Sequence, residues 1–178
     1  MTPKNIILLG LAIIAGVVLG MMYPIIGLIL FLPAMGFVVY ILVNNKGASE
    51  ADPVAAQAAR QFIASDGMAA IYVMRDGFVG GQQGMNLTVD DSLTTQFRTG
   101  RFARAEVAPG THRVAGRMAA QIGGSDTVQE VTLWAGECVL LDAKMEMGAL
   151  QGKLVFLETR NPAEARAKLA KLKLVEWR

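Results

Sequence analysis

The chain begins with one long apolar run and then changes to short segments in which apolar and polar residues alternate. From Ile6 to Val43, 38 consecutive residues include no Asp, Glu, Lys, Arg, His, Asn, Gln, Ser or Thr. As one helix this run would be about 57 Å long, nearly twice the hydrocarbon thickness of a bilayer. We therefore predict a transmembrane helical hairpin over residues 1–43, with spans at about 6–23 and 25–43 that turn at Pro24.

The first predicted span carries small residues at a spacing of four: Ala12, Gly16 and Gly20. Such a stripe lets helices approach closely in lipid, so it predicts a helix-packing face for the second span or for another subunit. The alternative is that glycine is simply common in membrane helices. A cleavable signal peptide is disfavoured because a second apolar span follows at once.

Lysine residues flank the hairpin, with Lys4 before it and Lys46 after it, while its central turn is uncharged. The positive-inside rule then favours both ends in the cytoplasm. A single span, with the remainder at the interface, is the alternative and would place the soluble domain on the other side of the membrane.

Residues 44–67 predict a polar linker followed by a short helix. Asp52 has the character of an N-cap and Pro53 of a first helical residue, and the helix should extend to about Ile63. Asn161 and Pro162 repeat this signal, so residues 161–178 predict a closing helix that ends near Leu172.

Between these helices, residues 68–160 change to short apolar runs separated by Gly, Pro and Asp. Seven or eight strands at spacings near ten residues are typical of an antiparallel β-sandwich, and nothing indicates a parallel sheet. The predicted strands are Ala69–Met74, Met85–Val89, Leu93–Arg98, Phe102–Val107, Thr111–Ala115, Val128–Trp134, Cys138–Met145 and Lys153–Glu158.

Composition narrows the functional classes. The chain is 53% hydrophobic and 18% charged with a net charge of +2, and the charged residues all lie outside the apolar run. A net charge this small provides no general attraction to nucleic acid. With one cysteine, Cys138, and one histidine, His112, the chain can form neither an internal disulfide nor a Cys/His zinc cluster, and we predict no metal or cofactor.

The candidates for catalysis are better explained as structural residues. His112 follows a Pro-Gly turn and should lie near the surface at the start of a strand, and no nucleophile-elbow motif surrounds any serine. Cys138 at a strand start suits a small buried hydrophobe. Asp90 and Asp91 lack the surrounding pattern of a calcium loop and suit a hairpin turn. We therefore predict that the protein is not an enzyme.

A glycine-rich segment, 77–84, lacks the Gly-Lys-Ser/Thr ending of a phosphate-binding loop. Because loops of β-sandwiches often carry recognition, Phe78, Gln82 and Gln83 are our predicted contacts with a partner.

The closing residues 160–178 carry six basic and two acidic side chains, a net charge of +4. They could lie on anionic lipid headgroups. The favoured interpretation is a helix that covers the β domain with Leu169, Leu172 and Trp177 while its lysines face solvent.

The soluble part, about residues 68–174, resembles a bacterial family known as domain of unknown function 2846. The resemblance rests on the order of five segments: Ala70–Arg75, Leu87–Asp90, Thr99–Phe102, Val107–His112 and Leu133–Glu137. The Pro-Gly turn is also similar to PEGA-type β modules. The resemblance implies a small Ig-like or PEGA-like sandwich presented at the bacterial envelope, with no catalytic residue to transfer. Similar members are often lipoproteins, whereas here a hairpin stands in place of the lipid-accepting cysteine.

Together these patterns predict a multi-pass protein of the bacterial inner membrane, with its soluble domain in the cytoplasm or, alternatively, in the periplasm. The predicted partners are the lipid bilayer and a protein, or a second copy bound through the hairpin. We expect a non-enzymatic scaffold or accessory subunit. A module that binds an envelope ligand or glycan is the alternative, and a hydrolase is disfavoured.

Overall fold

The computed structural model describes residues 20–23, 25, 29, 31–33, 35–36, 39–40, 43, 47–77, 83–119, 121, 125–147 and 152–177. The chain divides into two compact units, Met1–Val43 and Asn44–Arg178, and we call the second the β unit. In chain order the elements of the β unit are α3 (Pro53–Ala59), β1 (Ala69–Arg75), β2 (Met85–Val89), β3 (Leu93–Phe97), β4 (Arg101–Val107), β5 (Gly110–Met118), β6 (Thr127–Leu133), β7 (Cys138–Met147), β8 (Gly152–Thr159), α4 (Pro162–Leu169) and β9 (Lys173–Leu174).

In the N-terminal unit, the described residues between 20 and 43 are helical apart from Tyr23, which stands directly before Pro24. Most of the two predicted spans lies outside the described residues, as do Ala12 and Gly16. Gly20 is described, and no described atom lies within 4 Å of a Cβ built on it. Among the residues that the structure describes, no helix has both the length and the apolar character needed to cross a membrane.

The strands of the β unit form two sheets. The five-stranded sheet has the order β8-β7-β1-β4-β9, and the four-stranded sheet has the order β3-β2-β5-β6. The four-stranded sheet is antiparallel throughout, as predicted. The five-stranded sheet is mixed, because β1 pairs in parallel with β7 and β4 pairs in parallel with β9. The prediction of purely antiparallel pairing is wrong for this sheet.

One hydrophobic core lies between the two sheets. The five-stranded sheet contributes Ile71 and Leu141 to it, and the four-stranded sheet contributes Leu87 and Val114, all of them fully buried. These residues alternate along their strands with residues of the opposite face, as expected where one face of a sheet is buried. The predicted mainly β class is therefore confirmed.

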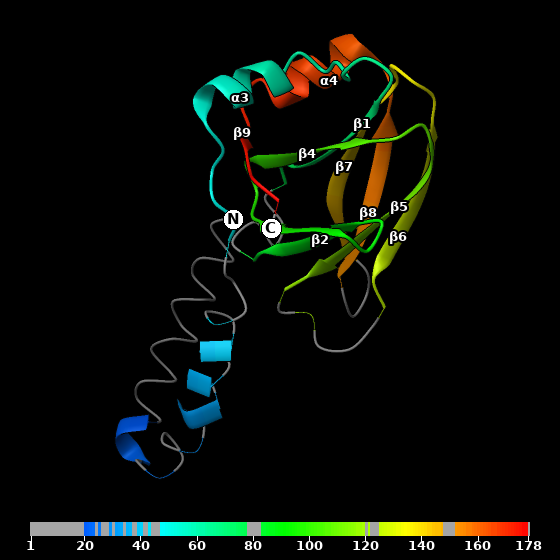
Figure 1. The fold of residues 1–178 in the computed structure, drawn as a ribbon. Helices are drawn as coiled ribbons and strands as arrows, with labels where there is room; N and C mark the ends of the chain where they lie inside the picture. Colours follow the sequence, from blue (N-terminus) through cyan, green and yellow to red (C-terminus); the bar gives the residue numbers. More distant parts are fainter. Residues whose placement is uncertain are drawn as a thin grey trace. The chain divides into compact units, whose positions relative to one another are not determined.

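A second cluster lies on the other face of the five-stranded sheet. There α3, α4 and the residues just after each of them pack against β1, β4 and β7 (Figure 1). The apolar residues of this cluster are Ala59, Phe62, Ala70, Tyr72, Met74, Phe102, Cys138, Leu140, Ala165, Leu169 and Leu172. Leu169 and Leu172 are buried in this cluster, as predicted, whereas Trp177 lies beyond α4 and packs against the inter-sheet core instead.

Both helix starts follow the sequence signals. Asp52 accepts hydrogen bonds from Val54 N and Ala55 N, and Asn161 does the same for Ala163 N and Glu164 N, each with a proline in the first helical turn. These side chains satisfy amides that have no partner within the helix. Both helices end earlier than predicted, at Ala59 and Leu169.

On one side of the β unit, β8 of the five-stranded sheet packs against β5 and β6 of the four-stranded sheet. A Cβ on Gly116 would lie 2.7 Å from Phe156 Cζ and 2.9 Å from Leu154 Cδ2, so glycine lets these β8 side chains lie against β5. The Thr127 hydroxyl donates a hydrogen bond to the Leu154 carbonyl over 2.9 Å. Strands β5, β6 and β8 thus meet through side chains at this edge.

Candidate functional site

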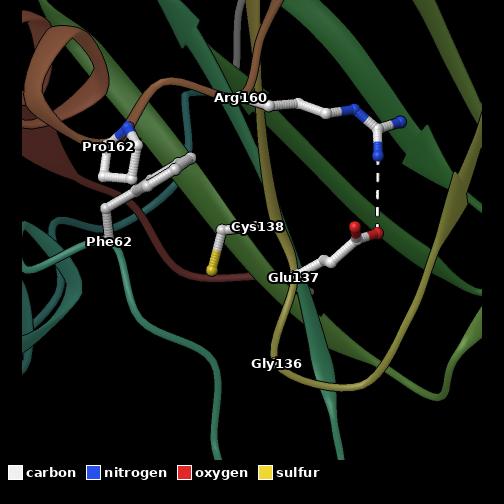
Figure 2. Close-up of a pocket in the computed structure, with 6 residues that line it drawn as sticks. All are labelled: Phe62, Gly136, Glu137, Cys138, Arg160 and Pro162. Atoms are coloured by element: carbon white, nitrogen blue, oxygen red, sulfur yellow. Dashed lines mark hydrogen bonds and ion pairs between the residues drawn. The ribbon is translucent and has the colours of Figure 1, made fainter.

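A hollow of about 230 Å³ opens beside the turn between β6 and β7. Figure 2 shows Phe62 and Pro162 on one side of it and the Arg160–Glu137 pair on the other. Its lining residues are Phe62, Gly136, Glu137, Cys138, Arg160 and Pro162. They come from five places in the chain: the segment after α3, the β6–β7 turn, the start of β7, the connection from β8 to α4, and the start of α4. The hollow is smaller than a typical pocket for a drug-sized ligand.

The two charged side chains that line the hollow, Arg160 and Glu137, are hydrogen-bonded to each other and to neighbouring groups. Arg160 donates from Nε to Glu158 over 2.7 Å, from Nη1 to Glu137 over 3.4 Å and from Nη2 to the Thr132 carbonyl over 3.1 Å. Glu137 also accepts the backbone N–H of Trp134 over 2.8 Å. Arg160 therefore fixes the β6–β7 turn and ties β6 to the end of β8.

Cys138 contributes the sulfur atom of the hollow. Its residue is 9% exposed, and burial raises the pKa of the thiol. A raised pKa disfavours the thiolate, which is the nucleophilic form of cysteine. The site therefore gives no activation to this thiol, and its burial agrees with the prediction of a small buried hydrophobe.

Phe62 reaches the hollow through an unusual backbone conformation. Its φ is +55°, in the left-handed region that bulky residues rarely adopt. Its ring centroid lies 4.8 Å from that of Tyr72, inside the helix-covered cluster. The buried ring holds the segment after α3 against the five-stranded sheet and so shapes one wall of the hollow.

Trp134 projects from the same turn and is 71% exposed. Gly136 N donates to Met68 O over 2.7 Å and Glu137 N donates to Trp134 O over 3.0 Å, so the turn is hydrogen-bonded on both sides of Ala135. A large aromatic side chain thus stands in solvent on a well-fixed turn. Tryptophan is enriched among residues that dominate protein–protein binding energy.

His112 lies at the start of β5 as predicted, but its ring is largely enclosed rather than superficial. Its Nδ1 lies 2.6 Å from Asp90 Oδ2, and its Nε2 lies 2.7 Å from the Ala108 carbonyl oxygen. Each ring nitrogen therefore lies against an oxygen atom, so the ring joins two turns and presents no free nitrogen to a nucleophile.

Asp90 and Asp91 form the β2–β3 turn with φ values of +49° and +54°. Asp90 accepts from Arg113 N over 2.9 Å, and Asp91 pairs with the Arg113 guanidinium over 2.9 Å. Burial raises the pKa of Asp90, but the Arg113 N–H and the His112 ring outweigh it, so the pKa is lowered overall. These carboxylates hold the turn against β5, in agreement with the turn interpretation.

The predicted loop contacts are only partly described. Phe78 and Gln82 lie outside the described residues. The Gln83 carbonyl accepts a hydrogen bond of 2.6 Å from Nη1 of Arg75, a buried arginine at the end of β1 whose pKa is lowered by burial. Gln83 therefore contributes to anchoring one end of the loop, and its role as a partner contact stays a prediction.

Within the described ranges, no group of three or more His, Cys, Asp or Glu side chains could hold a metal ion. No family model matches the chain, and no curated protein matches it either. The resemblance to domain of unknown function 2846 stays a prediction.

The sequence around β6 contains a pattern that points to Trp134 as an exposed residue. In β6, Val131 and Leu133 are buried while Glu130 and Thr132 are exposed. Trp134 follows in the same alternation and shares the outward direction of Glu130 and Thr132, although its residue type favours burial. An aromatic residue on the polar side of a strand is the signal that could have identified it.

Proposed function

We propose that the chain is a membrane-tethered, non-enzymatic β-sandwich module that binds a protein partner through the β6–β7 turn. The observation that carries this proposal is the 71% exposed Trp134 on a turn fixed by Glu137 and Arg160. A rigid aromatic anchor loses little conformational entropy when it enters a partner's pocket.

The apolar N-terminal unit supports the tether. Its described large hydrophobic side chains, from Met21 to Val43, are between 42% and 78% exposed. An apolar surface of this extent is unfavourable in water and suits lipid or other apolar helices. Together with the 38-residue apolar run, this supports insertion of residues 6–43 as a hairpin.

Sandwich architecture is supported by the core that the two sheets share. Each sheet contributes alternate side chains to one apolar layer, which is the arrangement of aligned or orthogonal β-sandwiches. The resemblance to Ig-like or PEGA-like modules belongs to the same proposal.

Quantitative co-purification from native membranes tests the partner-binding role. A tagged full-length chain and its Trp134→Ala variant are extracted in mild detergent, and the bound proteins are compared. Loss of an anchor that contributes about 2 kcal/mol should weaken the affinity for a specific partner roughly thirtyfold and so reduce its recovery. Leu157→Ala is the matched control, since Leu157 is also exposed but lies on β8. Equal recovery with both variants would remove the β6–β7 turn as the binding site.

Localisation to the inner membrane with the β unit in the cytoplasm is also proposed, on the charges flanking the apolar run. A cysteine introduced at the exposed Ser125, with Cys138→Ser as background, should resist a membrane-impermeant thiol reagent in spheroplasts and react after lysis. Labelling before lysis would place the β unit in the periplasm.

A further inference from the structure

The described residues just before α3, 47–52, are hydrogen-bonded onto the rest of the β unit. We call residues 47–52 the strap. Ala51 N donates to Leu174 O over 3.0 Å, and Glu176 N donates to Ser49 O over 3.1 Å. Glu50 and Val175 form an antiparallel bridge between these two bonds. The strap thus extends the five-stranded sheet beyond β9.

The strap also reaches the other sheet. Ala48 N donates to Gln96 O of β3 over 2.6 Å. The Thr95 hydroxyl, also on β3, donates to Glu176 O over 2.8 Å. The strap and the C-terminal residues therefore lie together along the edges of both sheets.

One carboxylate holds the middle of the strap. Glu50 pairs with Lys173 over 2.9 Å and with Arg101 over 3.2 Å. Hydrogen bonds from Lys173 and then Arg101 lower the pKa of this carboxyl. All three side chains are partly or largely in solvent, so the ion cluster is screened and reversible.

The strap is less buried than the C-terminal residues against which it lies. Ser49 and Glu50 are exposed, and Ala48 packs only partly against the core. In contrast, Val175 is 2% exposed, its N–H donates to Phe102 O over 2.9 Å, and Trp177 Nε1 donates to Arg104 O over 2.7 Å. Opening the strap breaks the backbone hydrogen bonds of Ala48, Ser49 and Ala51 described above, together with the ion cluster, while the main core stays closed.

The strap ends where the chain is anchored again. Asp52 caps α3, and Ala56 and Ala59 of that helix are buried. Local opening of the strap would therefore stop at α3. Segments with few buried contacts open at lower free energy than the core of the same domain.

We propose that the strap opens and closes while the rest of the β unit stays folded, with Glu50, Arg101 and Lys173 as its latch. Because Asp52 stays in place as the cap of α3, opening frees the five residues 47–51, about 17 Å of extended chain. On the proposed function, this lengthens the tether between the membrane hairpin and the β unit, and so increases the distance at which a partner can be reached.

Amide hydrogen exchange on the full-length chain in detergent micelles tests the proposal. In the wild type, the amides of Ala48, Ala51 and Glu176 should exchange faster than that of Val175. Glu50→Gln should accelerate the first three by roughly two- to fivefold and leave Val175 unchanged. Sodium chloride at 1 M, with a Debye length of about 3 Å, should move the wild type toward the variant and leave the variant itself unaffected.

Glu130→Gln is the matched control, because it removes an exposed carboxylate on β6, away from the strap. If the three strap amides exchange no faster than Val175, the strap opens only with global unfolding and the proposal is overturned. If Glu50→Gln and Glu130→Gln change the exchange rates of the strap amides equally, Glu50 does not hold the strap closed. Neither result depends on partner binding. A failure of the strap proposal in this test can therefore be distinguished from a failure of the partner-binding proposal in the Trp134→Ala test.

Discussion

The two sheets of the β unit differ in what lies on their outer faces. All seven residues of β1, in the five-stranded sheet, are buried, whereas in β2 of the four-stranded sheet buried residues alternate with more exposed ones. The outward-facing residues of the first sheet include Tyr72, Phe102 and Leu140, which are apolar or aromatic and lie beneath the helices. Those of the second include Thr94, Thr111 and Glu130, which are exposed.

This difference explains why two very short helices are stable. With seven and eight residues, α3 and α4 are shorter than the length at which isolated helices form in water. Their buried residues, among them Ala59 and Leu169, lie on the apolar outer face of the five-stranded sheet. The five-stranded sheet and the helices therefore stabilise each other. The four-stranded sheet has polar residues on its outer face, which can lie in water without a helix over them.

The largest loss of stability should come from removing a buried side chain between α4 and the five-stranded sheet. Leu169→Ala removes a fully buried side chain of α4 and should reduce the free energy of unfolding by about 2–5 kcal/mol. Equilibrium urea unfolding of the full-length chain in detergent, followed by the fluorescence of Trp134 and Trp177, measures this. Leu157→Ala makes the same chemical change at a 45% exposed position and should cost less than about 1 kcal/mol. Similar losses at both sites would mean that α4 does not stabilise the sheet.

Acid should weaken the covered face through Glu106 on β4. The Ser65 hydroxyl donates to this carboxylate over 2.6 Å, and that bond, together with Arg104, lowers its pKa despite partial burial. A lowered pKa contributes stability above the unfolded value, near pH 4.3, and this contribution is lost as the pH falls through the folded value.

Glu106→Gln should therefore lower stability at pH 7, by less than about 1 kcal/mol for so solvent-accessible a pair, and should reduce the loss between pH 5 and pH 3. Thermal unfolding at stepped pH measures both changes. Glu130→Gln removes an exposed carboxylate from the open face and serves as the control. Identical pH profiles for the two variants would refute a specific contribution of Glu106.

The same comparison shows what could be predicted from the sequence. The eight predicted strands are all present with small shifts at their ends, because period-two alternation and Gly or Pro turns are local signals. The parallel pairing of Ala70 with Cys138 joins residues far apart in the chain, and no local pattern encodes it. Strand β9 has two residues, too few to show a period.

The candidate site was harder to predict for a related reason. Cys138 and the Asp90 turn could be interpreted from residue type and flanking positions. The hollow could not, since it brings together Phe62, Glu137 and Arg160 from separate elements. Arg160 in particular reads as one of several basic residues near the C-terminus, and its three acceptors become apparent only in the folded chain.

The smallest effect should come from the open face. Thr111 and Thr132 are cross-strand partners on β5 and β6, with their hydroxyl oxygens 2.9 Å apart. Both are exposed, so water can replace the hydrogen bond when Thr111→Val removes one hydroxyl, and valine suits a strand as well as threonine does. The free energy of unfolding should change by no more than about 0.5 kcal/mol, measured by the same urea titration. A loss above 1 kcal/mol would instead show that something covers this face in the folded protein, because only a buried hydroxyl is costly to leave without its partner.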